Sequence, residues 1–338
     1  MSLTAPLWIS EAEVVAMMDM GEAIAALEKG LLMEARGDAK NMVKTHVAWG
    51  DGSTLHAIGA VFPGEQFAGT KTWAHTEGGA TPLLVLFDSE TGSLKAIIEA
   101  FALGQLRTAS ASGVATNLLA AKDADDFAII GTGKQAITQV AAVVAVRSIK
   151  RIRLFGPNED RRERFAARVK EEFDIEAVAA RSVPEAVEGA AIITVATRAT
   201  EPIIGGEMIA RGAHINAIGA IVPNRAEIAR DVLERCDRIV IDSVSQARKL
   251  SRELIDFFGA ADQEGWEQVT SLANLVAAGE KRVAKDDLTL FKSLGMGISD
   301  LALGIELYRK ARATGLGREF AQPQRVMPRL RAAQTLSH

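Results

Sequence analysis

Apolar and polar residues follow two different patterns along this chain, and the pattern changes near residue 122. In the first part, short stretches rich in apolar and β-branched residues are separated by turn signals such as "GDGS" and "PGEQ". We expect strands at 42–50, 53–61, 67–75, 81–88 and 94–100. Because short turns join these strands, they should form an antiparallel sheet.

Helical spacing flanks this sheet on both sides. Ser10 and Glu13 have the spacing of a capping box, and we expect it to open a helical region that reaches about Arg36. Residues 101–122 carry apolar residues along one helical face and predict a second long helix.

After residue 122 the apolar residues come in short continuous runs, most of them separated by helical segments. The runs lie at 127–130, 151–155, 175–178, 191–196, 213–219 and 238–242. This alternation predicts βαβ units, and continuous runs are typical of parallel strands covered on both faces. A helical segment is expected at 225–235, and the long helix after residue 288 should return the chain to the first domain.

The pattern therefore predicts an α/β protein with two domains. The first, an α+β domain with an antiparallel sheet, combines residues 1–121 with 306–338. The second, at 122–305, is a Rossmann domain with a doubly wound parallel sheet. A length of 338 residues suits two domains of ordinary size.

Composition narrows the choice of partners. With 48% hydrophobic and 24% charged residues the chain should fold, and a net charge of −4 gives no reason to expect nucleic acid. The basic stretch 161–170 carries Phe165, Ala166 and Val169 at helical spacing, which favours a solvated helix face.

Targeting and metal signals are missing as well. Cys236 is the single cysteine, which excludes an internal disulfide and fits a reducing compartment. The longest apolar run, 140–146, is too short to span a bilayer, so we expect a cytoplasmic protein with no membrane partner. The five histidines show no metal-binding spacing, and no metal site is expected.

The segment "FAIIGTGKQA" (127–136) is a strand, a G-x-G-x-x-A turn and the start of a helix. Gly131 permits a tight turn, Gly133 lets the backbone approach a pyrophosphate, and Ala136 allows close packing of helix and strand. The free N–H groups at the helix start would face the phosphates. The motif predicts a dinucleotide site that includes Thr132, Lys134 and Gln135.

The residues that would select NAD or NADP give a weaker signal than the glycine turn. Gly156 stands where NAD-binding folds usually place an acid after the second strand, and Asn158 is the nearest polar group. Glu159 or Asp160 could favour NAD, whereas Arg161 and Arg162 could admit NADP. We expect NAD and leave NADP open.

Four segments together resemble the ornithine cyclodeaminase/μ-crystallin family. They are "LRTASASGVATNLLA", "IIGTGKQA", "INAIGAIVPNRAEI" and "LFKSLGMGISDLAL", and the resemblance runs from about residue 10 to 315. It implies a homodimer whose first domain carries dimerisation and substrate binding. It also implies an enzyme that handles α-amino or α-imino acids with a nicotinamide cofactor.

The resemblance assigns two catalytic residues. Lys71 would contact the substrate near its carboxylate or imine and relay a proton. Arg107 would hold the α-carboxylate with its planar guanidinium. Leu294 would line the substrate pocket. The cofactor would meet Thr108, Asn158, Thr197, Ala217, Ile218, Gly219, Arg225 and Ser293, besides the glycine turn.

Two departures from the family pattern bear on the substrate. Lys44 stands where the family has a first substrate arginine, so the charge is kept but the bidentate fork is lost. Ile221 stands where cyclodeaminases carry an aspartate that can handle the substrate amine. Ornithine cyclodeamination is therefore disfavoured.

The remaining reaction is reduction of a small 2-imino acid, or formally an amino-acid dehydrogenase. Lys44, Lys71 and Arg107, with His46, His56 and His75 as further candidates, suggest a substrate with a second negative charge. Iminosuccinate, reduced to aspartate, is the specific expectation. Pyrroline-2-carboxylate or another cyclic ketimine, an alanine-type dehydrogenase reaction, and a non-catalytic crystallin-like binding protein are the alternatives.

Overall fold

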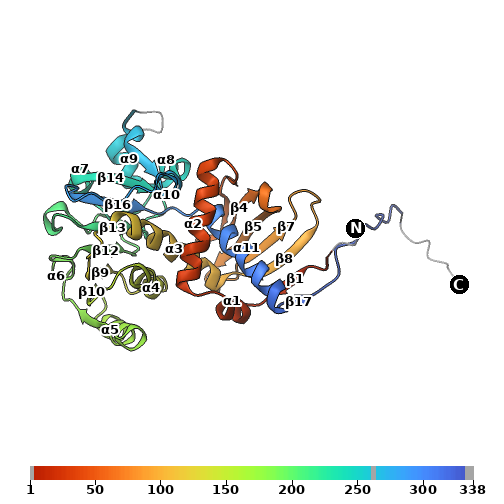
Figure 1. Ribbon diagram of the computed structural model, residues 1–338, viewed down its shortest axis with the longest axis horizontal. Helices are drawn as coiled ribbons and strands as arrows, with labels where there is room; N and C mark the ends of the chain where they lie inside the picture. The colour runs from red at the N-terminus through yellow and green to blue at the C-terminus, as the bar shows by residue number, and fades with distance from the viewer. Residues whose placement is uncertain (1–3, 260–263, 332–338) are drawn as a thin grey trace.

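Two sheets of different kind form the two halves of the molecule in the computed structural model, which describes residues 4–259 and 264–331 (Figure 1). The sheet on the right of Figure 1 is mostly antiparallel, and the sheet on the left is parallel with helices on both sides. Both predicted sheet types are confirmed. The predicted division at 305/306 stays a prediction, and it falls inside helix α11 (Gly297–Thr314).

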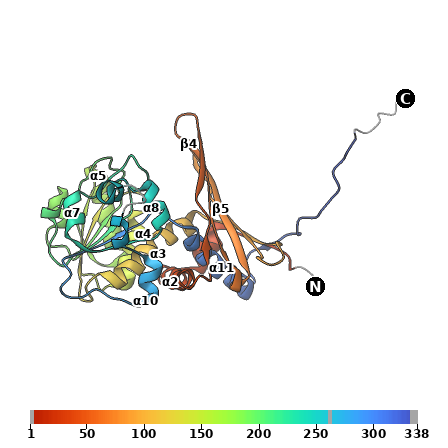
Figure 2. The same ribbon diagram turned by 90° about the horizontal axis from the view of Figure 1, so that it is seen from above.

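The antiparallel sheet has the order β17-β1-β8-β7-β5-β4-β2, with β3 on β4 and β6 on β5. Its strands are β1 (Leu7–Ile9), β2 (Lys40–Asn41), β3 (Thr45–Trp49), β4 (Ser53–Phe62), β5 (Phe67–Thr76), β6 (Gly79–Ala80), β7 (Leu83–Phe87), β8 (Leu94–Glu99) and β17 (Arg318–Glu319). Strands β4 and β5 reach beyond the helices that cover the sheet, and the segment after β17 leads away from the body (Figure 2).

The parallel sheet has the order β11-β10-β9-β12-β13-β16-β14-β15. Its strands are β9 (Asp126–Ile130), β10 (Arg151–Phe155), β11 (Glu176–Ala179), β12 (Ile192–Val195), β13 (His214–Ala217), β14 (Cys236–Ile241), β15 (Val269–Ser271) and β16 (Leu288–Lys292). Every residue of β12, β13 and β16 is buried, as expected of parallel strands covered on both faces. The strand order reverses between β9 and β12, where doubly wound folds bind ligands.

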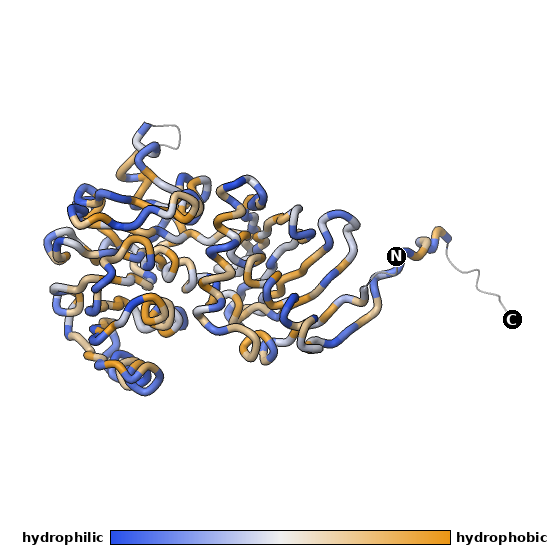
Figure 3. Tube along the Cα trace, in the orientation of Figure 1, coloured by the Kyte–Doolittle hydropathy of each residue, from blue (hydrophilic) through white to orange (hydrophobic). Residues whose placement is uncertain are grey.

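Helices cover both sheets. They are α1 (Glu11–Met17), α2 (Met20–Arg36), α3 (Phe101–Leu119), α4 (Ala136–Val146), α5 (Glu159–Phe173), α6 (Val183–Val187), α7 (Arg230–Arg235), α8 (Val244–Leu250), α9 (Arg252–Phe258), α10 (Leu272–Ala278), α11, and the 3₁₀ turns η1 (Pro63–Glu65), η2 (Gly206–Met208) and η3 (Glu264–Gln268). Helix α11 packs on the antiparallel sheet, as expected of the returning helix. Polar colour along α5 marks its solvated side (Figure 3), while Phe165, Ala166 and Val169 are buried.

Two helical predictions need correction. The region from Glu11 to Arg36 is two helices, because Met18 is extended and Asp19 starts a new helix with Glu22 in a second capping box. The helix expected at 225–235 begins only at Arg230, because the carbonyl of Glu227 accepts hydrogen bonds from the backbone of Ile203 and Ile204.

Strand β1 carried no signal that we recognised. It is three residues long and pairs in parallel with β8 and antiparallel with β17. Among the described residues, no helix is long and apolar enough to cross a membrane.

Candidate active site

Lys71 lies in the middle of β5 with its side chain buried on the face that α11 covers. The residue is 3% exposed, and its Nζ lies 2.5 Å from Oδ1 of Asp300. The ammonium also lies over the ring of Trp73, 5.3 Å from the ring centre. Gly104 of α3 is close by, because a Cβ built there would stand 3.7 Å from Nζ. Removing the Lys71 ammonium from water is costly, and the Asp300 carboxylate and the face of Trp73 compensate this cost.

Arg107 reaches the same carboxylate from α3. Its Nε lies 3.4 Å from Asp300 Oδ1, and its guanidinium packs against Gly295. Gly295 has φ +87° and a Cβ there would lie 2.9 Å from Nη1, so only glycine leaves this space. Since Gly295 belongs to the segment after β16, Arg107 adjoins the carboxyl edge of the parallel sheet.

Asp300 joins these two cations and is a site residue that sequence reasoning missed. It is fully buried on the first turn of α11, and within the described residues its Oδ2 has no hydrogen-bond partner. One carboxyl oxygen thus receives both cations while the other is left for a further donor. An acid inside the apolar segment "GISDLAL" was the available signal, since a buried carboxylate needs a partner.

The electrostatics of the cluster favour a lysine that can give up its proton. Burial lowers the pKa of Lys71 to about 8; the charges of Arg107 and Lys44 act in the same direction, and Asp300 opposes them. Burial also lowers the pKa of Lys44, on which the charges of Arg107, Asp242 and Asp300 act. Lys44 therefore belongs to the same cluster, although it comes from the segment between β2 and β3.

The histidines lie beside this cluster. His46, His56 and Trp73 stack in a row across β3, β4 and β5, with ring centres 5.5 and 4.7 Å apart. Burial, reinforced by Lys44, lowers the pKa of His56 to about 4, so this ring is neutral at pH 7. His46 and His75 are exposed. The stack extends the aromatic wall next to Lys71.

The glycine turn has the geometry that a pyrophosphate requires. Gly131 has φ +116°, and a Cβ there would meet the carbonyl oxygen of Ala196 at 2.4 Å. A Cβ on Gly133 would meet nothing within 4 Å, so the backbone there is open to a ligand. The N–H of Ala136, at the start of α4, donates to the carbonyl of Gly133 at 3.0 Å. No side chain caps the helix, so the next N–H groups of its first turn can meet an anion. The turn lies at the point where the strand order reverses.

The other predicted cofactor residues occupy the carboxyl edge of the same sheet. Thr197 follows β12, Ile218 and Gly219 follow β13 (which ends at Ala217), and Ser293 follows β16. The hydroxyl of Ser293 donates to Asp242 at 2.8 Å, and the same carboxylate accepts from the backbone N–H groups of Leu294 and Gly295. Thr108 donates its hydroxyl to the carbonyl of Gly104 at 2.9 Å.

Three further predicted positions make local contacts of their own. Asn158 accepts from the backbone of Arg161 and caps α5, so its carbonyl oxygen is already engaged. Arg225 is half-buried in a turn with Val222. Ile221 packs against the apolar core of the parallel sheet. Arg162, considered above for a 2′-phosphate, is buried and donates to the carbonyl of Gly156 at 2.8 Å.

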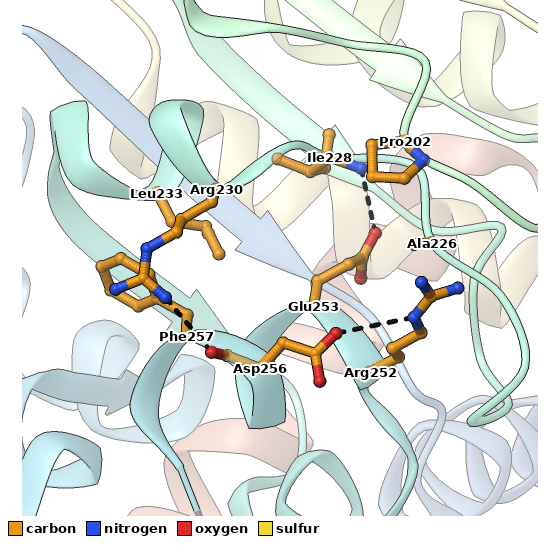
Figure 4. Close-up of a pocket in the computed structure, with 9 residues that line it drawn as sticks. All are labelled: Pro202, Ala226, Ile228, Arg230, Leu233, Arg252, Glu253, Asp256 and Phe257. Carbon is orange, nitrogen blue, oxygen red and sulfur yellow. Dashed lines mark hydrogen bonds and ion pairs between the residues drawn. The ribbon is translucent and has the colours of Figure 1, made fainter.

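Cys236 and a surface pocket lie outside this site. Burial raises the pKa of Cys236 to about 12, so it is not a nucleophile. A cavity of about 150 Å³ between α7 and α9 is lined by Arg230, Arg252, Glu253, Asp256 and apolar neighbours (Figure 4). Its arginines form ion pairs with nearby acids, and none of the predicted site residues lines it.

Within residues 4–259 and 264–331, no cluster of acids, histidines or cysteine could hold a metal ion.

Comparison with known proteins gives a consistent picture. The sequence profile of the ornithine cyclodeaminase/mu-crystallin family matches residues 6–315. A Delta(1)-pyrroline-2-carboxylate reductase of Bacillus cereus is 33% identical over 240 residues, 70% of this chain and 72% of that protein.

Two solved structures have the same overall fold. The Thermococcus litoralis Delta(1)-pyrroline-2-carboxylate reductase, in complex with NADH and L-proline, superposes with a TM-score of 0.86 at 29% identity, covering 93% of this chain and 100% of that one. An archaeal alanine dehydrogenase dimer with bound NAD has a TM-score of 0.86 at 26% identity, covering 94% and 99%.

Proposed function

The chain belongs to the ornithine cyclodeaminase/mu-crystallin family, and we propose that it reduces the C=N bond of a small 2-imino acid with NADH. The observation that carries this proposal is the convergence of Lys71, Arg107 and Asp300. They meet beside the carboxyl edge of a parallel sheet that bears a dinucleotide turn. The pyrroline-2-carboxylate reductases and the alanine dehydrogenase described above support the same reaction class.

The residues of the parallel sheet fit a dinucleotide. The backbone of 131–133 and the first turn of α4 would hold the pyrophosphate, and the loops after β12 and β13 would border the nicotinamide. A bound nicotinamide supplies or accepts a hydride at the reacting carbon. The complexes of relatives with NADH or NAD support NAD(H) as this cofactor.

Each residue of the cluster has a distinct role in this proposal. Arg107 would hold the substrate carboxylate and so fix the position of the imine carbon. Lys71 would donate a proton to the imine nitrogen, which takes up the electron pair of the C=N bond when the carbon is reduced. Asp300 holds Lys71 in place, and its unpartnered oxygen would accept a hydrogen bond from the N–H that forms on this nitrogen.

The relatives change the order of the candidate substrates. The Bacillus cereus protein and the Thermococcus litoralis structure are both Delta(1)-pyrroline-2-carboxylate reductases. We therefore place pyrroline-2-carboxylate, reduced to proline, ahead of iminosuccinate, which sequence reasoning had put first.

Reduction is tested by following NADH and NADPH oxidation at 340 nm with a panel of imines. The panel contains pyrroline-2-carboxylate, oxaloacetate with ammonium, and pyruvate with methylamine, and ornithine is assayed separately for ammonia release. We expect turnover with NADH that is fastest with pyrroline-2-carboxylate. Faster turnover of oxaloacetate with ammonium would restore iminosuccinate, and nucleotide binding without any turnover would support a binding protein.

We further propose that the protein is a homodimer. Three exposed apolar residues lie together at the projecting end of the antiparallel sheet, where Val47, Trp49 and Leu55 are 58%, 47% and 45% exposed. Apolar residues gathered on one part of a surface mark an interaction site. The dimeric state of the archaeal alanine dehydrogenase supports this assignment.

A further inference from the structure

Glu227 is a buried carboxylate to which the sequence assigns no role. It is 0% exposed and lies in the segment between β13 and α7. Its Oε1 accepts from the backbone N–H of Thr197 at 2.6 Å and from the Thr197 hydroxyl at 2.7 Å. Its Oε2 accepts from the N–H groups of Gly219 and Ala220 at 2.8 and 2.9 Å. All four donors belong to the loops that follow β12 and β13.

The two loops touch each other directly at this point. A Cβ on Gly219 would lie 2.2 Å from the carbonyl oxygen of Thr197 and 2.4 Å from Glu227 Oε1. Only glycine leaves room for this contact, and beside it the Glu227 carboxylate accepts hydrogen bonds from both loops. Strands β12 and β13 are neighbours in the sheet, and β12 borders the point where the strand order reverses.

Two further buried charges support Glu227 from behind. Oε1 of Glu253 accepts from the backbone N–H groups of Glu227 and Ile228 at 2.6 and 3.1 Å, and Figure 4 shows the second of these bonds. Oε2 of Glu253 lies 2.6 Å from Nζ of Lys292, the last residue of β16. Burial raises the pKa of Glu227, while Lys292 and the Thr197 donors favour its charged form.

We propose that Glu227, supported by Glu253 and Lys292, is a positioning residue that fixes the two loops against which the nicotinamide end of the cofactor would lie. This inference rests on the proposed use of NADH. Glu227 touches neither substrate nor cofactor in this scheme. It acts through the backbone of Thr197 and Gly219, and it links the ends of β12, β13 and β16 in one charged network.

The hydrogen-bond geometry predicts different effects for two substitutions. Four donors need two acceptor oxygens, but a glutamine has one oxygen and one NH₂ group. Glu227→Gln therefore loses the tether to one loop and sets its NH₂ against two donors. Glu227→Asp keeps both acceptors and withdraws them by one methylene, so its effect should be smaller.

The test is the dissociation constant for NADH, measured by tryptophan fluorescence on the full chain. We expect Glu227→Gln to weaken NADH binding at least tenfold and Glu227→Asp to weaken it less. In imine reduction, the KM for NADH should rise while the KM for the imine stays near wild type. Glu234→Gln, an exposed glutamate on α7, is the matched control and should leave NADH binding unchanged.

A folded Glu227→Gln protein with wild-type NADH affinity would overturn the inference. If that variant does not fold, Glu227→Asp decides, because wild-type affinity there refutes the spacing role. Glu253→Gln is the second measurement: it leaves Lys292 without its partner and should weaken NADH binding several-fold. If wild-type protein itself does not bind NADH, it is the proposed function that fails.

Discussion

The ammonium group of Lys71 is buried away from water, and this burial lowers its pKa. Burial brings its pKa to about 8, while the negative charge of Asp300 keeps it from falling further. A lysine in this range is largely protonated at pH 7 and can still release its proton during a reaction. In the proposed reaction the ion pair therefore serves the proton transfer as well as the fold.

The pH dependence of reduction follows from this balance. Lys71 must carry a proton to donate it, so kcat should be level below the pKa and fall as the pH rises through about 8. In Asp300→Asn the opposing charge is gone, and the fall should move to lower pH. The profile of kcat from pH 6 to 10 checks both statements.

Asp88→Asn is the matched control for this prediction. Asp88 pairs with Lys95 on the same sheet, 2.9 Å apart, away from the Lys71 cluster. Its profile should follow wild type. A kcat of Asp300→Asn that falls at the same pH as wild type would show that Lys71 is not the group that titrates.

Removal of the two cations should have separable effects. Lys71→Ala removes the proton donor, and we expect kcat to fall by about 10²–10⁴-fold with little change in the dissociation constant for NADH. Arg107→Ala removes the carboxylate contact and should raise the KM for the imine as well as lower kcat. Lys95→Ala, another lysine of this sheet, is the control. Near wild-type rates in Lys71→Ala would refute its assigned role.

The residues that the sequence revealed differ physically from those it did not. Gly131 and Gly133 belong to a local motif, because a tight turn, a strand and a helix are all encoded within ten residues. Asp300 pairs with Lys71 across 229 positions, and Glu227 joins a loop 30 positions away to one 8 positions away. The acid within "GISDLAL" signals a buried carboxylate, but no local pattern shows which partner it meets. Only the resemblance to a family pointed to Lys71 and Arg107 together.

At the scale of elements, the proposed active site depends on how closely α11 approaches β4. Gly297 begins α11, and a Cβ there would lie 1.8 Å from the carbonyl oxygen of Gly59 in β4. Asp300 is one turn further along the same helix. The backbone contact therefore holds Asp300 at the level of Lys71, whose strand β5 pairs with β4.

Gly297→Ala should displace the start of α11 and disturb the site. Overpacking of this kind costs about 1–3 kcal/mol, so we expect a lower melting temperature together with a lower kcat. Differential scanning fluorimetry and the NADH assay measure the two effects. Gly64→Ala in η1, where a Cβ meets nothing within 4 Å, should change neither. A Gly297→Ala enzyme with wild-type stability would mean that the helix adjusts without cost.

Helices and strands were predictable where a single sequence pattern, such as an apolar run or a turn signal, determined them. Buried parallel strands such as β9 and β12 gave continuous apolar runs, and the β4–β5 meander gave turn signals. The prediction was wrong where a helical pattern competed with a capping signal or with a tertiary backbone contact. The break between α1 and α2 follows from a second capping box inside a helical pattern, and 225–229 are non-helical because their backbone bonds to a distant segment.

At the scale of the whole molecule, the projecting end of the antiparallel sheet has two different faces. One face carries the His46–His56–Trp73 stack that leads toward Lys71. The other carries Val47 directly opposite Leu55, with Trp49 two residues further along β3. Strands β3 and β4 thus place an aromatic wall and an apolar strip on opposite sides of one thin sheet.

The apolar strip should be the contact between two copies of the chain. We expect size-exclusion chromatography with light scattering to give twice the mass of one chain, and the double variant Val47→Asp, Leu55→Asp to give monomers. Aspartates placed opposite each other repel and resist desolvation, so they should oppose association at this face. Val283→Asp, at a valine of similar exposure (40%) outside this sheet, should remain dimeric. NADH binding should survive in the monomer, because the dinucleotide turn lies in the other sheet. A dimer that persists in the double variant would place the contact elsewhere on the molecule.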